Sequence, residues 1–486
     1  MSQEFEHTST AHESSAKEPI GIDVETLLNE MIAEVVFKYE KMKSSQMTRK
    51  PKPDSRAERN RLRKERRQAS GLGQFLTAFA ATEMERPKSH RLEQLPKESR
   101  DKNAEDDEEP VPAKRIKLAE CDFSKVNGDL TPIACYDVTA YLGRTKKENL
   151  YMKSCMWSPD GRYLLTTSQD NCARVFELDE ENKLVLKRKY RFGGPVLCTA
   201  WKTGRKSEIF ATSCKYVPVQ LWSVDKDESV DTIKGVELTV PYDPVYSLAF
   251  STDGDCLFMG TKGKIKMHYF APQKGQPKDL TMKGPSGLVS CFAVHPGDPS
   301  TIVAGSYNKE VRIMSTTNPE HGSNFDTEFP ATHLAFSHSG KYLFVGGRST
   351  NEIHRFDWSK LHAKIEPTMR LERPMNTQQK INFQIERNDR YLLSGSTAGE
   401  ILIYDLEDKE NDGGLHRPSY RCKASESAVC GLSLHPTKAL LATAHGQWVV
   451  PRTVYFSDTE EESEPRRYDE GGFPFDNNVK LWDLTQ

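Results

Sequence analysis

The side chains that could take part in binding chemistry are aromatic and basic, and they occur in short segments between runs of apolar residues. They are Tyr151, Lys153, Tyr216, Tyr242, Lys262, Lys264, Tyr307, Lys309, Arg348, Gln378, Gln379, Lys380, Gln447 and Trp448. An unstacked base can lie on an aromatic ring while a neighbouring lysine or arginine contacts a phosphate, as in single-stranded RNA sites. A peptide-binding rim uses the same residue types. The pattern therefore predicts a binding face and leaves RNA and peptide open as its ligand.

Catalytic motifs are absent from the sequence. It contains no GxxxxGK[ST] phosphate-binding loop, no GxGxxG after a strand, no HExxH and no GxSxG. His295 and His435, each followed by proline, are expected to stabilise turns rather than to bind a metal. We therefore predict a protein that is not an enzyme, with no cofactor and no metal site.

Composition excludes a membrane-embedded chain and a disulfide scaffold. The 68 basic and 70 acidic side chains leave a net charge of -2, and no apolar run approaches the roughly 18 residues of a spanning helix. The N-terminus shows no apolar secretory signal. None of the ten cysteines forms a CxxC pair, so we expect buried thiols in a reducing compartment.

The elements that must position the binding residues form a repeat that begins near residue 150. Each copy has an alternating apolar strand, a turn, a second strand rich in small residues and a third strand that ends in an aromatic residue. Equivalent positions recur every 42 to 49 residues. The seven copies are 154–178, 198–224, 247–270, 290–315, 333–358, 382–406, and 431–447 completed by 477–484.

This period, the Ser-Pro-Asp-Gly turns and the terminal Trp482-Asp483 resemble the WD40 family. The resemblance implies an all-β fold, a seven-bladed WD40 β-propeller. A ring of six blades with one additional hairpin is the alternative. On such blades, the binding residues lie in the loops between second and third strands and in the segments that lead into each first strand.

The ring occupies residues 129–486 and must be closed by a segment outside the seven copies. The last copy ends two residues before Gln486, so the chain supplies no outer strand for the seventh blade. The segment 133–142 has strand composition and is predicted to pair there. An acidic insertion, 449–476, interrupts the seventh blade and is predicted to be a disordered loop.

Residues 1–128 are predicted to form a mostly disordered arm, because they contain only 6 of the 44 aromatic residues. Three segments stand out: an amphipathic helix over 23–43, a basic segment over 56–67, and 112–118. The last is a candidate nuclear import signal. Its basic residues are Lys114, Arg115 and Lys117.

A closer resemblance is found in the sixth and seventh copies. The strings NTQQKINFQIERNDRYLLSGSTAGEILIYDL (376–406), NDGG (411–414) and LSLHPTKALLATAHGQWVVP (432–451) resemble the telomerase Cajal body protein 1 family. This resemblance implies an RNA-binding scaffold of the nucleus and the Cajal body. Its expected partners are small Cajal body RNA of the box H/ACA type, possible telomerase RNA, H/ACA ribonucleoprotein components and other Cajal body proteins, with no membrane. A protein-only hub, such as a ubiquitin-ligase substrate receptor, remains the alternative.

Overall fold

The computed structural model describes residues 123, 130–141, 150–204, 208–215, 217–226, 229–233, 244–272, 277–361, 365–375, 377–408, 414–447 and 476–485. The chain divides into two units, Met1–Gly73 and Gln74–Gln486, and every described residue lies in the second. The predicted helix 23–43, the basic segment 56–67, the import signal 112–118 and the insertion as far as residue 475 lie outside the described residues. No helix of the described parts is long and apolar enough to span a membrane.

Each of the seven sequence copies forms three consecutive strands. In chain order they are β2 (Met152–Trp157), β3 (Tyr163–Ser168) and β4 (Cys172–Leu178); β6 (Val196–Trp201), β7 (Ile209–Cys214) and β8 (Val217–Ser223); β10 (Ser247–Phe250), β11 (Cys256–Gly260) and β12 (Lys262–Tyr269); β13 (Asp279–Val294), β14 (Thr301–Ser306) and β15 (Glu310–Ser315); β17 (Ala331–Phe336), β18 (Tyr342–Gly347) and β19 (Glu352–Asp357); β21 (Phe383–Ile385), β22 (Tyr391–Gly395) and β23 (Glu400–Asp405); and β26 (Val429–Leu434), β27 (Leu440–His445) and β28 (Asn478–Asp483).

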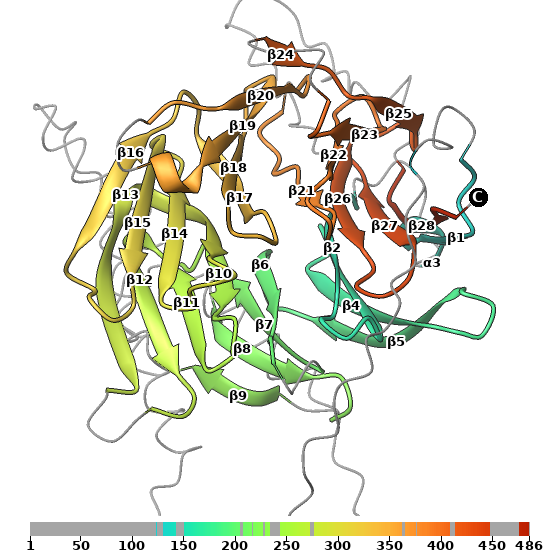
Figure 1. Ribbon diagram of the computed structural model, residues 1–486. Coiled ribbons are helices and arrows are strands. Elements are labelled where there is room, and N and C mark those ends of the chain that lie inside the picture. The colour runs from blue at the N-terminus through green and yellow to red at the C-terminus, as the bar shows by residue number, and fades with distance from the viewer. Residues whose placement is uncertain are drawn as a thin grey trace, which may run out of the picture. The chain divides into compact units, whose positions relative to one another are not determined.

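Outer strands and short helices complete these units. They are β1 (Ala134–Asp137), α3 (Val138–Tyr141), β5 (Leu184–Arg191), β9 (Ser229–Ile233), β16 (Gly322–Asp326), β20 (Met369–Glu372), β24 (Leu415–His416), β25 (Tyr420–Lys423) and the 3-10 turn η2 (Trp358–Lys360). The sheets lie around a common centre with strands such as β2, β6, β17 and β26 innermost, so the fold is an all-β propeller (Figure 1).

The prediction of seven separate blades is not what the described residues show. They form six hydrogen-bonded sheets, of which five have the four or five strands of a single blade and one has seven strands. The seven-stranded sheet, β10 to β16, contains the third and fourth sequence copies. The two copies are joined because β13 runs from one to the other without interruption.

The long strand β13 pairs with strands of both copies and changes direction between its two paired parts. Its first part, around Lys283, pairs with β12, and its second part, from Val289, pairs with β14. Between them Gly287 has a φ of +80°, and a Cβ there would lie 2.5 Å from the side chain of Asn308. Glycine therefore permits both the left-handed backbone and the close approach of the next turn.

The sheet of the seventh sequence copy is closed by a segment from far upstream. Strand β1 pairs antiparallel with β28, placing Ala134 opposite Leu481 and Asp137 opposite Asn478. This is the position at which the closing strand 133–142 was expected, but the strand ends at Asp137. The Asp137 carboxylate accepts a hydrogen bond from the backbone N–H of Thr139 at 2.8 Å, which begins the turn α3.

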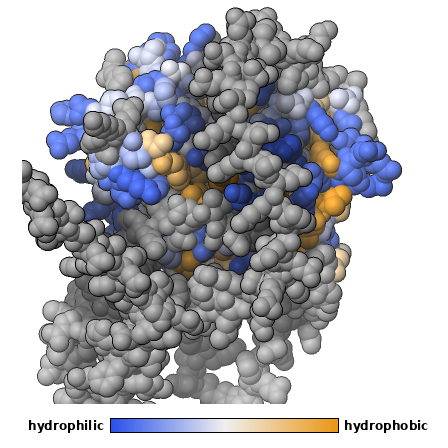
Figure 2. Space-filling view, turned by 90° about the horizontal axis from the view of Figure 1, so that it is seen from below, coloured by the Kyte–Doolittle hydropathy of each residue, from blue (hydrophilic) through white to orange (hydrophobic). Residues whose placement is uncertain are grey.

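Hydrophobic clusters join each copy to the next. The first and second copies meet around Tyr190 and Phe210, for example, and the seventh and first meet around Leu164 and Leu481. Middle strands such as β3 are buried along their whole length, whereas the outer strand β5 mostly alternates half-buried and exposed residues. Viewed from below, the described part of the surface is mainly hydrophilic, with separate apolar patches between the polar groups (Figure 2). Burial between neighbouring copies, at about 1.5–3 kcal/mol per large apolar side chain, holds the ring together.

Candidate nucleic-acid interface

The turns between second and third strands, and the connections into each first strand, lie at the same ends of the antiparallel sheets. We call this surface the loop face. Eleven of the fourteen predicted binding residues are described and lie at these strand ends, whereas Tyr216, Tyr242 and Trp448 lie outside the described residues. The contacts of the eleven divide them into groups with different roles.

The seven-stranded sheet brings two of the predicted loops together. Lys262 stands opposite Leu288 of β13 in the strand register, and the carbonyl of Leu288 accepts a hydrogen bond from the backbone N–H of Tyr307 at 3.1 Å. Lys262 and Tyr307 therefore flank one residue of β13. Lys264 and Lys309 are close to them in sequence, and both are exposed.

An aromatic ring and a guanidinium stack where the fourth and fifth copies meet. The guanidinium carbon of Arg348 lies 4.0 Å from the ring centroid of Tyr307, and both side chains are half-buried. Beside them the Gln378 amide donates to the hydroxyl of Ser349 at 2.8 Å. A cation on an aromatic ring holds both groups in place, so the pair presents a flat surface of fixed orientation.

Gln379, in contrast, is a structural residue. Its side chain is buried, and its amide nitrogen donates to Cys430 Sγ at 3.1 Å and to the Gly446 carbonyl at 3.3 Å. These bonds tie the connection before β21 to the end of β27. The prediction that Gln379 contacts a ligand does not agree with this burial, because a polar side chain satisfied inside the protein has nothing left to present.

Two predicted lysines also bond within the protein. Lys380 Nζ donates to the carbonyl of Ser290 at 2.7 Å, and Lys153 Nζ approaches the carbonyl of Val196 at 3.5 Å. Burial lowers the pKa of Lys153 to about 8, so part of its charge is lost near neutral pH. Both ammonium groups have only carbonyl partners in the described chain, and their first role is to link inner strands.

Tyr151 and Gln447 lie at the junction of the seventh and first copies. Gly446 has a φ of +144°, and a Cβ there would lie 2.4 Å from Cβ of Tyr151, so the two segments are in close contact. Burial raises the pKa of the Tyr151 hydroxyl to about 12. Tyr151 is half-buried, whereas Gln447 is exposed.

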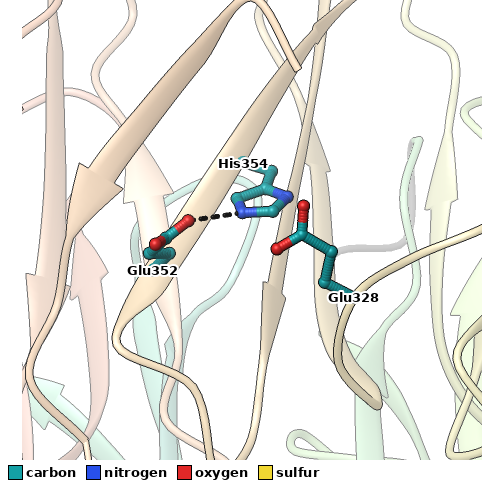
Figure 3. A group of neighbouring side chains, drawn as sticks. All are labelled: Glu328, Glu352 and His354. Carbon is teal, nitrogen blue, oxygen red and sulfur yellow. Dashed lines mark hydrogen bonds and ion pairs between the residues drawn. The ribbon is translucent and has the colours of Figure 1, made fainter. Parts of the chain in front are cut away.

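A cluster that the sequence analysis missed lies on the fifth copy. Glu328, Glu352 and His354 bring ligand atoms within 4.8 Å of one another, and the carboxylate of Glu352 lies 2.8 Å from His354 Nε2 (Figure 3). Arg370 bonds both carboxylates, at 3.0 Å to Glu352 and 2.6 Å to Glu328. This guanidinium already occupies the position that a cation would take. The i, i+2 spacing of Glu352 and His354 on one strand face was the only signal in the sequence.

The opposite strand ends, which carry the turns between first and second strands, form the turn face. There His435 Nδ1 accepts from the backbone N–H of Lys438 at 3.0 Å, so Nε2 carries the proton and donates to the Gly161 carbonyl at 3.0 Å. His295 makes the corresponding bond to the Gly340 carbonyl at 3.2 Å. The prediction that these histidines stabilise turns is confirmed, and each also links its own copy to the next.

Comparison with known proteins agrees with this architecture. The family described as WD domain, G-beta repeat matches residues 147–177. Telomerase Cajal body protein 1 of Homo sapiens is 28% identical over 342 residues, which are 65% of this chain and 61% of that protein. This chain resembles the telomerase Cajal body protein 1 family. The Drosophila melanogaster homolog of telomerase Cajal body protein 1 is 24% identical over 61% of this chain and 57% of its own length.

The resemblance extends to one protein with another name. Guanine nucleotide-binding protein negative regulator 1 of Schizosaccharomyces pombe is 26% identical over 54% of this chain and 72% of its own length. The chain spans about three fifths of the length of the telomerase Cajal body protein 1 relatives that it matches. The prediction of this resemblance from the sixth and seventh copies is confirmed, and the fold is a WD40 β-propeller.

Proposed function

We propose that this chain is a non-enzymatic scaffold that binds small Cajal body RNAs of the box H/ACA type. We extend the proposal to telomerase RNA where it carries the same loop element, and to delivery of these ribonucleoproteins to Cajal bodies. The observation that carries the RNA part is the stacked pair Tyr307 and Arg348, with exposed lysines beside it on the loop face. The names of the relatives support the Cajal body part.

The contacts suggest how a small RNA loop is held. One unstacked base extends the stack formed by Arg348 and Tyr307, while Lys309 and Lys264 contact phosphates. Gln378, which is exposed, stands beside the pair and can hydrogen-bond a base edge. Stacking contributes about 1–3 kcal/mol per base, so a few bases and phosphates suffice for a specific site.

The proposal places the protein in the nucleus. Lys114, Arg115 and Lys117 supply the import signal, and H/ACA ribonucleoprotein components and other Cajal body proteins are the protein partners. We also assign the seven-stranded sheet to two blades that share β13, which gives seven blades from the seven sequence copies. The hydrophobic cluster between β12 and β14 residues supports this assignment, because it resembles the clusters between the other neighbouring copies.

The test is a triple variant of the full chain, Tyr307→Ala, Lys264→Ala and Lys309→Ala. We leave Lys380 unchanged because its bond to Ser290 joins two copies, so its removal would mix stability with binding. In cells, crosslinking followed by RNA sequencing is expected to recover small Cajal body RNA with the natural protein and at least tenfold less with the variant. The melting temperature of the purified variant is expected to stay within about 2 °C.

A matched variant tests whether RNA recovery depends on where the lysines and the tyrosine lie or only on their number. Lys183→Ala, Lys187→Ala and Tyr342→Ala remove the same residue types away from the loop face, and RNA recovery is expected to be unchanged. Undiminished RNA on the loop-face variant would contradict the proposed face. RNA no different from that of an unrelated nuclear propeller would contradict RNA binding itself and favour the protein-only hub, for example a ubiquitin-ligase substrate receptor.

A further inference from the structure

The third strand of the third copy carries a row of lysines on one face. In β12, Lys262, Lys264 and Lys266 alternate with residues such as Ile265, which is fully buried between the third and fourth copies. Because side chains alternate along a strand, Lys264 and Lys266 share the opposite face. Lys262 precedes them at the turn, where Gly263 has a φ of +68° and the strand register shifts. Lys262 and Lys264 are exposed, and Lys266 is half-buried.

The neighbouring strand adds a fourth lysine to this face. Lys283 of β13 is exposed and stands directly opposite Lys264 in the antiparallel register, while Thr281 stands opposite Lys266. Side chains paired in this way lie about 5 Å apart at Cβ, and like charges there destabilise the pair. We call Lys262, Lys264, Lys266 and Lys283 the lysine track.

The lysine track has no carboxylate partner in the part of the chain that the structure describes. Other lysines at outer positions do: Lys187 pairs with Glu177 at 2.9 Å, and Lys360 pairs with Asp357 at 3.2 Å. Lys183 likewise pairs with Glu181. An unpaired group of four ammonium groups, two of them face to face, leaves positive charge that an anionic ligand would neutralise.

The position and spacing of the lysine track point to the class of anion. Its Lys262 end stands opposite Leu288, whose carbonyl bonds the backbone of Tyr307, so the track begins beside the loop face. Lys264 and Lys266 are two strand residues apart, or about 6.7 Å. That interval is comparable to the spacing of neighbouring phosphates in an extended single strand. An extended acidic peptide has a similar interval, so it is the nearness of the track to the stacked pair on the loop face that favours RNA.

We propose that the lysine track binds the phosphodiester backbone of single-stranded RNA adjoining the loop that the loop face holds. This inference rests on the proposed function, because the loop must be bound for its flanking strand to reach β12. The track supplies affinity without base recognition, since ammonium groups contact phosphates and carry no sequence information. Base selectivity stays with the loop face.

The experiment compares two RNA probes on the full chain: a box H/ACA small Cajal body RNA hairpin, and the same hairpin extended by a single-stranded flank of about ten uridines. The test variant is Lys266→Gln and Lys283→Gln, which leaves Lys264 in place because it also contacts the loop. The control variant is Lys187→Gln and Lys360→Gln, which removes the same charge from ion-paired lysines. Dissociation constants are measured from 50 to 500 mM salt, and melting temperatures confirm that both variants fold.

The natural protein and the control are expected to bind the flanked hairpin more tightly than the bare one. In the test variant most of this gain disappears, and the slope of log affinity against log salt for the flanked hairpin becomes shallower by about 1.4, or 0.7 for each lost contact. If the flank adds no affinity while the bare hairpin binds normally, the assignment of the lysine track to RNA is overturned and the proposed function is not. Failure of the natural protein to bind either hairpin overturns the proposed function. A decamer of glutamate that binds the natural protein and displaces the flank-dependent gain at equal affinity overturns the RNA assignment in favour of an acidic peptide.

Discussion

The two faces of the ring are built from the same strands but differ in how their polar groups are used. On the turn face, side chains bond backbone groups of a neighbouring copy: His435 reaches Gly161, and the Asp389 carboxylate accepts from the backbone N–H groups of His338 and Ser339 at 2.6 and 2.8 Å. On the loop face, Lys153 and Gln379 make bonds of this kind, but Lys262, Lys264 and Lys309 are exposed.

This difference shows where stability and binding are located. A turn-face side chain that bonds a neighbouring copy contributes to ring closure, so its removal should lower the free energy of unfolding. An exposed loop-face lysine contributes little to the free energy of unfolding, and its ammonium group is available to a ligand. The comparison between the two faces can be tested with substitutions that change either stability or RNA binding and leave the other unchanged.

The largest expected effect is the loss of stability in His435→Ala. The imidazole bonds three turn groups and stacks edge-on against Trp157 at 4.8 Å, so its removal leaves the Gly161 carbonyl and two backbone N–H groups without partners. We expect the free energy of unfolding to fall by about 3 kcal/mol, measured by urea denaturation, with RNA affinity unchanged. His321→Ala, at an exposed site, is the control and should change stability by less than about 0.5 kcal/mol. Equal effects of the two variants would contradict the role assigned to the His435 imidazole.

The second effect is a dependence of stability on pH. Burial holds the pKa of His435 at about 4, below its ordinary value of 6.5. Between these values the unfolded imidazole binds a proton that the folded one does not, so stability is full above pH 6.5 and falls as pH decreases toward 4. At about 1.4 kcal/mol per pKa unit, reduced because solvent partly screens this ring, we expect the group to contribute a loss of about 2 kcal/mol across that window. In His435→Gln the decline should be shallower by that amount, and an identical pH profile would contradict the assignment.

The sequence predicted the roles of turn-face residues better than those of loop-face residues, and the reason is physical. The repeat period and the alternation of apolar residues are local signals, and they located all seven strand triplets and the role of His295. Partners far apart in sequence give no such signal. Gln379 reads as a loop residue until Gly446 and Cys430 are placed beside it, and the Glu328 to Arg370 ion pair spans 42 residues. The continuity of β13 was also missed, because the copies 247–270 and 290–315 leave its first part, 279–289, outside any predicted strand.

The third effect concerns binding alone. Tyr307→Ala is expected to weaken binding of a box H/ACA small Cajal body RNA hairpin by about 2 kcal/mol, because it removes the ring of the stacked pair with Arg348. The double variant with Arg348→Ala should lose much less than the sum of the two single losses, since the two groups act as one surface. Isothermal titration of the natural protein, the two single variants and the double variant provides this double-mutant cycle. Tyr307→Phe is the control that keeps the ring. Strict additivity would show that the two groups bind independently.

The smallest expected effect is at Lys309, where one substitution tests stability and RNA binding separately. Lys309 has a φ of +68°, a left-handed conformation that disfavours a side chain, and its ammonium group is exposed. Lys309→Gly relieves this conformation but gives the unfolded chain more freedom, so stability should change by between 0 and about +1 kcal/mol. The same change removes one cation and should make the salt slope of RNA binding shallower by about 0.7. Lys309→Asn, which tolerates the left-handed region, should match glycine in binding. A variant that loses stability together with affinity would place Lys309 among residues that hold the ring, as His435 does, and would contradict the division between the two faces.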